Sequence, residues 1–304
     1  MVLGFQQDLT ANYGKTEVLS PLITRVLCQN PSPYTYTGTN TYLVGAGEGM
    51  AVIDPGPDNF DHGVAILRAA AGRKVDKILV THSHIDHSPL AASLSEKTGA
   101  PIYGFGPHGI GRKGGLEGEE VEAGADWDFK PNILIADGDT ITGPDWTITA
   151  HHTPGHTANH MCFHLLEENT VFVGDHIMAW ATTVISPPDG DVRHYIESLK
   201  KIAALAPDIL VPTHGPWIEN AAPFIRGIIT HRHMREGQIL KHLEGGVETI
   251  GDLVALMYKA VDVRLHPAAA RSVLGHMIAL VDEDKVVCKG TIGLSGVYSL
   301  PQTQ

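Results

Sequence analysis

The chain has 304 residues, of which 43% are hydrophobic, so it can form one large domain with a smaller one, or two domains. Asp and Glu outnumber Lys and Arg by 34 to 22, and the net charge of -12 argues against a chain-wide basic surface for nucleic acid. No apolar run approaches the ~20 residues of a membrane-spanning helix, and the polar N-terminus lacks the apolar core of a signal peptide. We therefore expect a cytoplasmic protein without membrane association.

Histidine and cysteine usage points to metal chemistry without thiolates. The 18 histidines are an unusually large share of the chain. The three cysteines are scattered and form no C-x-x-C pair, so they indicate neither a disulfide framework nor a thiolate zinc site. We expect Cys28, Cys162 and Cys288 to pack as small hydrophobic residues.

The first half of the chain alternates short apolar runs with turn residues. Residues 1–20 form a polar lead-in without a predicted element. Hydrophobic periodicity then predicts strands at 22–28, 41–44, 50–53, 75–80 and 101–105. One helix is predicted just before the strand at 75–80, and a second helix, at 89–97, is predicted after it. Residues 106–126 are Gly-rich and acidic, and their spacing does not match a phosphate-binding P-loop, so a surface loop is predicted.

The second half repeats the alternation. Strands are predicted at 146–149, 161–165, 171–173 and 209–212, and one amphipathic helix is predicted at 194–205. Two such halves predict an α/β protein in which two sheets pack face to face with helices outside. A long helix at 217–243 leads to two further helices and a terminal hairpin, the pattern of a winged-helix-like module. We place the boundary within the long helix, which gives domains 1–235 and 236–304.

One stretch carries most of the chemistry. The strand at 75–80 ends in Thr81-His82-Ser83-His84-Ile85-Asp86-His87. His82 and His84 are two positions apart, so on an extended backbone they face the same way, while Asp86 and His87 follow where the chain turns toward a helix. This arrangement suits two metal ions rather than one. Zinc is the commonest ion at His-rich sites, and iron or manganese could use the same ligand types.

Three further candidate ligands each follow an apolar strand. His156 stands in a tight turn after Pro154-Gly155, Asp175 follows Val173-Gly174, and His214 follows Val211-Pro212-Thr213. Each of them alone could be an ordinary polar residue with a structural role. Together, and in this order after the first motif, they are specific for a metal site.

With these motifs, residues 20–230 resemble the metallo-β-lactamase fold superfamily. The resemblance implies an αββα sandwich with the site at the sheet edges. It implies two divalent metal ions, with one ligand residue shared between them: His82, His84 and His156 for the first ion, Asp86, His87 and His214 for the second, and Asp175 as the bridge. It also implies that Asp54, in Ile53-Asp54-Pro55-Gly56, orients ligands from behind.

Such a site implies hydrolysis, because two neighbouring ions lower the pKa of a shared water toward about 7 and polarise a carbonyl or phosphoryl oxygen. We expect Asp86 to act in catalysis as well as in metal binding. We also expect His160 to be catalytic, because it resembles a position where relatives place a polar residue that contacts the substrate. Thr182, Thr183 and the turn at 34–40 are expected to line or overhang the pocket.

The long helix and the winged-helix-like tail make the chain resemble the beta-lactamase-like protein 2 group, whose best known activity is an endoribonuclease on single-stranded RNA. A phosphodiesterase is therefore one expectation. A glyoxalase II-like thioesterase, or a hydrolase of small-molecule esters or lactams, would use a similar metal set. The non-enzymatic alternative is a winged-helix DNA-binding protein that senses a ligand.

The expected substrate is thus a small molecule or single-stranded RNA. Binding of RNA requires Lys and Arg near phosphates, and the tail offers five candidates: Arg232, Arg235, Lys241, Arg264 and Arg271. A winged helix can equally form a homodimer or cover a pocket, and both roles remain open.

Overall fold

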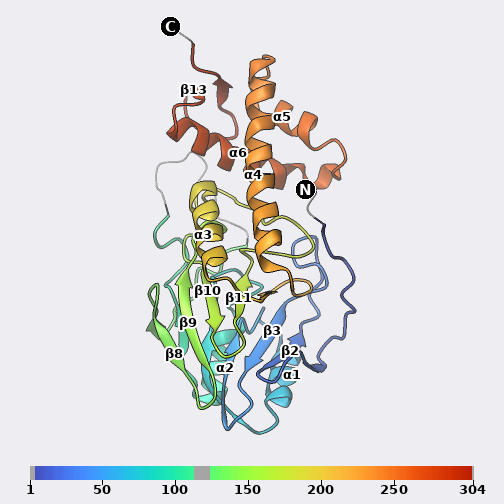
Figure 1. Ribbon diagram of the computed structural model, residues 1–304, viewed down its shortest axis with the longest axis vertical. Helices are drawn as coiled ribbons and strands as arrows, with labels where there is room; N and C mark the ends of the chain where they lie inside the picture. The colour runs from blue at the N-terminus through green and yellow to red at the C-terminus, as the bar shows by residue number, and fades with distance from the viewer. Residues whose placement is uncertain (1–3, 113–123, 303–304) are drawn as a thin grey trace.

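Two β-sheets form the centre of the larger domain in the computed structural model, which describes residues 4–112 and 124–302 (Figure 1). The first sheet has seven strands in the order of the chain: β1 Thr16–Val18, β2 Ile23–Leu27, β3 Asn40–Val44, β4 Gly49–Ile53, β5 Lys74–Leu79, β6 Ile102–Gly104 and β7 Ile133–Leu134. Strands β1 to β4 pair antiparallel through hairpins, whereas β4 to β7 pair parallel. Parallel pairing requires crossovers, which α1 (Phe60–Ala70) and α2 (Leu90–Thr98) supply after β4 and β5.

The second sheet has five strands in the order β12-β11-β10-β9-β8. Their bounds are β8 Thr140–Thr142, β9 Thr147–His152, β10 Met161–Leu165, β11 Thr170–Gly174 and β12 Ile209–Pro212. The crossover between the parallel strands β11 and β12 contains α3 (Val192–Ala204), and α4 (Ala221–Glu244) follows β12.

Three apolar layers hold these elements together. Side chains of both sheets, including Ile53, Trp146 and Phe172, form the layer between the sheets. The helices α1 and α2 pack on the outer face of the first sheet, and α3 and α4 pack on the outer face of the second. The predicted αββα sandwich is therefore confirmed.

The C-terminal part has a core of its own, formed by α4, α5 (Ile250–Met257), α6 (His266–Asp282) and a hairpin of β13 (Val287–Lys289) and β14 (Val297–Ser299). A 3-10 turn, Val263–Leu265, precedes α6. The long helix α4 contributes Ile225 and Ile228 to the hydrolase-side core, and Ile239 and Leu243 to the C-terminal core. It rises from the sandwich into this second part (Figure 1). We keep the domain boundary near residue 235 as our assignment.

Strands β1, β7 and β8 were not predicted. Strand β1 lies within the supposed polar lead-in, where Glu17 forms an ion pair of 2.7 Å with Arg25 of β2. Strand β7 has two residues and β8 has three, too few for a periodic signal. Residues 113–123 of the predicted loop lie outside the described residues, and 106–112 form turns. No helix among the residues that the structure describes is long and apolar enough to cross a membrane.

Candidate metal centre

The structure brings all seven predicted ligands together at one edge of the sandwich. His82, His84, Asp86 and His87 follow β5, and the other three occupy loops of the second sheet: His156 between β9 and β10, Asp175 after β11, and His214 after β12. Strands β5, β11 and β12 end at this edge, so side chains from distant parts of the sequence meet there.

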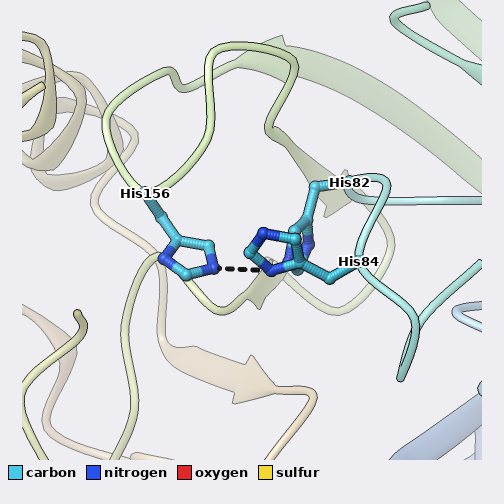
Figure 2. A group of neighbouring side chains, drawn as sticks. All are labelled: His82, His84 and His156. Carbon is cyan, nitrogen blue, oxygen red and sulfur yellow. Dashed lines mark hydrogen bonds between the residues drawn. The ribbon is translucent and has the colours of Figure 1, made fainter. Parts of the chain in front are cut away.

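The first group consists of three histidines that point toward one another (Figure 2). His82 Nε2 lies 3.0 Å from His84 Nδ1, and that nitrogen lies 3.2 Å from His156 Nε2. Two nitrogens that each lie about 2.0–2.1 Å from a tetrahedral zinc ion are about 3.4 Å apart. The spacing of these imidazoles is therefore close to that of three ligands around one ion.

The second group contains Asp86, His87 and His214. His214 Nε2 lies 3.1 Å from Asp86 Oδ2, and His87 Nε2 lies 3.7 Å from Asp86 Oδ1. Asp175 stands between the two groups. Its Oδ1 is 3.5 Å from His214 Nε2, while its Oδ2 is 3.9 Å from His156 Nε2. One carboxylate thus faces both groups, as a bridging ligand requires.

Buried ligand atoms in this centre fit a metal ion. His87 Nε2 and Asp175 Oδ1 have no hydrogen-bond partner among the described residues, although they lie only 3.6 Å apart. A buried polar atom without a partner costs free energy, which a bound cation would offset for both atoms. Imidazole and carboxylate are also the ligand types of zinc and iron sites.

The ring nitrogens on the far side of the imidazoles are held by the protein. His156 Nδ1 donates to the carbonyl of Val184 at 2.7 Å, and His214 Nδ1 donates to the carbonyl of Gly38 at 3.0 Å. Because a carbonyl can only accept, each bond fixes the proton on Nδ1 and leaves Nε2 as the atom that can bind a metal.

Asp54 holds a third imidazole and several backbone segments. Its Oδ2 lies 2.9 Å from His87 Nδ1 and accepts hydrogen bonds from the hydroxyls of Thr81, at 2.8 Å, and Thr213, at 2.7 Å. Its Oδ1 accepts from the Thr81 amide at 2.8 Å. One buried carboxylate therefore fixes the chain after β5 to the chain after β12. This confirms the expected position behind the ligands.

The charges of the centre oppose the effect of burial. Burial raises the pKa of Asp86, but His87 and the hydrogen bond from His214 outweigh it and hold that pKa well below its usual value. Burial also raises the pKa of Asp175, but the charges of His214 and His87 outweigh it and lower that pKa to about 2. Burial lowers the pKa of His87, but the carboxylates of Asp86 and Asp175 raise it well above its usual value. Metal binding would displace this proton, so affinity rises with pH.

His160, the other residue that we expect to be catalytic, lies just before β10. Its side chain is fully buried, its Nδ1 lies 2.9 Å from the hydroxyl of Thr153, and its ring centre is 5.1 Å from that of His82. The side chain thus offers no exposed surface to a substrate in this structure, and the catalytic role of His160 stays a prediction. The position beside His82 also suits a supporting role.

The residues expected to line the pocket mostly support the ligands. Thr183 is buried, and its hydroxyl donates to the carbonyl of Asp175 at 2.7 Å. In the turn at 34–40, Gly38 supplies the carbonyl bonded to His214, and the hydroxyl of Thr39 donates to the carbonyl of Asp86 at 2.9 Å. The supporting carbonyl of Val184 was missed, because every residue has one and the sequence carries no signal for it.

A cavity of about 220 Å³ lies beside the turn that carries His156. Its walls combine that turn with residues at the start of α3 and the side of α6, and they include Phe105, Pro154, Pro187 and Ile278. None of the seven ligands lines it. The C-terminal domain thus forms part of a largely apolar space next to the metal centre.

The metallo-beta-lactamase superfamily model matches residues 34–214, a span that contains Asp54 and all seven ligands. The chain belongs to this superfamily. A second model, of the beta-lactamase associated winged helix domain, matches residues 249–293. These matches confirm the resemblance and identify this metallo-beta-lactamase superfamily chain as a hydrolase with a C-terminal winged helix.

Two similar proteins differ in their names. A beta-lactamase-like protein 2 homolog of Drosophila melanogaster is 33% identical over 279 residues, which cover 88% of this chain and 90% of that protein. An atrochrysone carboxyl ACP thioesterase of Aspergillus fumigatus is 32% identical over 258 residues, which cover 82% of this chain and 75% of that protein. Among solved structures, a beta-lactamase domain protein of Burkholderia ambifaria has the same fold, with a TM-score of 0.79 at 19% identity over 97% of this chain and 96% of that one.

Proposed function

We propose that the chain binds two divalent metal ions and uses them to hydrolyse a carboxylic thioester or ester. His82, His84 and His156 would hold one ion, Asp86, His87 and His214 the other, and Asp175 would bridge them. His87 Nε2 and Asp175 Oδ1, which lie buried 3.6 Å apart and have no hydrogen-bond partner among the described residues, are the observation that supports metal binding. Zinc is the ion we favour, and iron or manganese would use the same ligands.

When bound, such ions supply a water of lowered pKa and polarise the carbonyl oxygen of the substrate. The protein keeps the ligand atoms deprotonated and oriented through Asp54, Val184 and Gly38. Asp86 has 22% of its side chain exposed, so it faces the open side of the centre. We assign to its carboxylate the orientation of the attacking water through a hydrogen bond, because its lowered pKa makes it a weak base. His160 would keep His82 in place.

The choice of a carbonyl substrate rests on the basic residues of the C-terminal part. Of the five candidates for phosphate binding, Arg232 is buried, and Arg264 forms an ion pair of 2.6 Å with Asp262. Arg271 donates to the carbonyl of Pro187, and Arg235 lies over the ring of Tyr258. Because Arg232 is buried and Arg264 is paired with Asp262, this part of the acidic chain offers less positive charge to a polynucleotide than the five candidates suggest.

Two further observations favour a thioester. A relative that is 32% identical is named as an acyl carrier protein thioesterase. The largely apolar cavity beside the His156 turn would accommodate an acyl group. The second candidate is phosphodiester hydrolysis, which the whole-chain likeness to beta-lactamase-like protein 2 homologues favours. A DNA-binding sensor fits less well, because a complete ligand set serves turnover and the tail has balanced charge rather than a basic stripe.

The test uses one purified sample for metal content and two assays. Metal is measured by inductively coupled plasma mass spectrometry, and hydrolysis is measured with an acyl-pantetheine thioester and with bis(p-nitrophenyl) phosphate. We expect two ions per chain. We also expect thioester hydrolysis to be at least about 10²-fold faster than phosphodiester hydrolysis, a difference of about 2.7 kcal/mol in transition-state stabilisation. Preference for the phosphodiester would move the proposal to RNA substrates. A metal content near zero after reconstitution would contradict it altogether.

A further inference from the structure

The loop between β11 and α3 connects two of the proposed ligands. Within it, the hydroxyl of Thr183 donates to the carbonyl of Asp175 at 2.7 Å, and the carbonyl of Val184 accepts from His156 Nδ1 at 2.7 Å. Residues 178–191 of this loop have no helix or strand, so these positions are not fixed by a sheet ladder. The dipeptide Thr183–Val184 therefore contacts the bridging carboxylate residue and a histidine of the first group.

A charged side chain from a distant helix holds this dipeptide. Arg232 of α4 donates through Nη2 to the carbonyl of Thr183. Its guanidinium also lies over the ring of Tyr195, 4.9 Å from the ring centre, and the hydroxyl of Tyr195 donates to the carbonyl of His176 at 2.8 Å. Arg232 and Tyr195 thus contact each other and secure both ends of the segment 176–183.

The burial of Arg232 has an energetic cost that needs a reason. The residue is only 3% exposed, and among the described residues its Nε has no hydrogen-bond partner. Burial of a charged group costs several kcal/mol unless it is fully paired, and an apolar residue of similar volume often serves packing as well or better. Arg232 occupies the buried face of α4 with Ile228 and Ile239, where an apolar residue would be expected.

We propose that Arg232 is a positioning residue of the metal centre. By holding the Thr183 carbonyl, it fixes Thr183–Val184 and through this dipeptide the positions of His156 and Asp175. This inference rests on the proposed binding of metal by those two residues. It means that α4, which contains none of the proposed ligands, helps to position two of them.

The same face of α4 continues this support into the C-terminal domain. Glu236 lies one turn after Arg232, accepts a hydrogen bond of 2.6 Å from Arg193 of α3, and lies 3.7 Å from His276 Nδ1 of α6. Arg193 also forms an ion pair with Glu283, just after α6. The winged-helix domain therefore contacts the same face of α4 one turn after Arg232.

The experiment compares three full-length variants in their affinity for Co²⁺, whose visible absorption reports the geometry of its ligands. Arg232→Met removes the donor and keeps the volume, Arg232→Lys keeps a charge and one donor group, and Arg226→Met is a control at an exposed arginine of the same helix. We expect Arg232→Met to bind one of the two Co²⁺ ions at least about tenfold more weakly, with an altered spectrum. Arg232→Lys should fall between Arg232→Met and wild type, because an ammonium reproduces neither the fork nor the stacking of a guanidinium. Arg226→Met should match wild type.

The thermal midpoint of each metal-free variant separates a change in metal binding from a general loss of structure. Wild-type affinity and spectrum in a folded Arg232→Met would overturn the inference. If Arg232→Met does not fold, Arg232→Lys decides: weaker binding at one site supports the inference, and two sites of wild-type affinity overturn it. If the wild type itself binds fewer than two Co²⁺ ions, the proposed function fails instead, whatever the variants show.

Discussion

Asp54 Oδ2 lies 2.9 Å from His87 Nδ1, and both side chains are completely buried. The carboxylate accepts from the imidazole on the side opposite the proposed metal, so it orients the ring and makes its free nitrogen a better ligand. Asp54 itself has a positive φ of 47°, a conformation that a non-glycine residue adopts at some cost in free energy. This strain sits at the residue on which two segments of the centre converge.

Replacement of Asp54 should therefore weaken metal binding more than it changes the fold. We expect Asp54→Asn to lower the affinity for one metal ion by about 10–100-fold, because the neutral amide orients His87 less firmly. The measurement is competition with a chromophoric chelator. Asp145→Asn is the matched control, since Asp145 accepts from the amides of Ala46 and Gly47 at the opposite end of β4. Equal losses in both variants would contradict the assigned role.

Loss of the bridging carboxylate should remove metal and activity together. Asp175 faces both ligand groups, with one oxygen 3.5 Å from His214 and the other 3.9 Å from His156. We expect Asp175→Ala to retain fewer than two ions after dialysis and to lose at least about 10³-fold in kcat/KM, as when a group acting mainly in the transition state is removed. Full metal content in this variant would refute the bridging role.

Gly155 should be indispensable to the turn that carries His156. A Cβ at this position would lie 2.4 Å from the backbone of Tyr195 at the start of α3, which cannot move away alone. Gly72 also has a positive φ, but a Cβ there would meet nothing within 4 Å. We expect Gly72→Ala to cost about 1 kcal/mol and Gly155→Ala at least about 3 kcal/mol in urea unfolding of the metal-free protein, with weaker metal binding by the latter. Similar costs would show that the contact with Tyr195 is not decisive.

His62 should make the fold sensitive to acid. Burial lowers the pKa of His62 to about 4, and its Nε2 lies 2.7 Å from the hydroxyl of Thr41. The unfolded chain, with a pKa near 6.5, binds a proton that the folded chain refuses, so stability is full above about pH 6.5 and falls as the pH drops toward 4. At pH 5 this single group costs about 2 kcal/mol.

The check compares unfolding of metal-free wild type and His62→Gln in urea at pH 7.5 and pH 5.0. Removal of the metal excludes the pH dependence of metal binding, and the titration of the other histidines is common to both proteins. The loss of unfolding free energy between the two pH values should be smaller in the variant by about 2 kcal/mol. An identical loss in both proteins would show that His62 is not the group responsible.

The sequence predicted the ligands because each lies in a short motif at the end of an apolar strand, where local pattern and chemistry coincide. It could not predict the carbonyls of Gly38 and Val184, because any residue can supply a carbonyl and only the fold decides which one is near an imidazole. The burial of Arg232 had a signal that we did not use. Helical spacing places it on one face with Ile228 and Ile239, although a charged residue on a helix normally faces solvent.

Helix α4 belongs to both hydrophobic cores without a break. Its 24 residues form a rod of about 36 Å that begins beside the sandwich and ends in the core of the winged helix. The two domains therefore lack the flexible linker that would let them swing independently. A partner that rotates the C-terminal domain would therefore move α4 and with it Arg232. The contact of Arg232 with the Thr183 carbonyl would then shift, and so would the geometry of the metal centre.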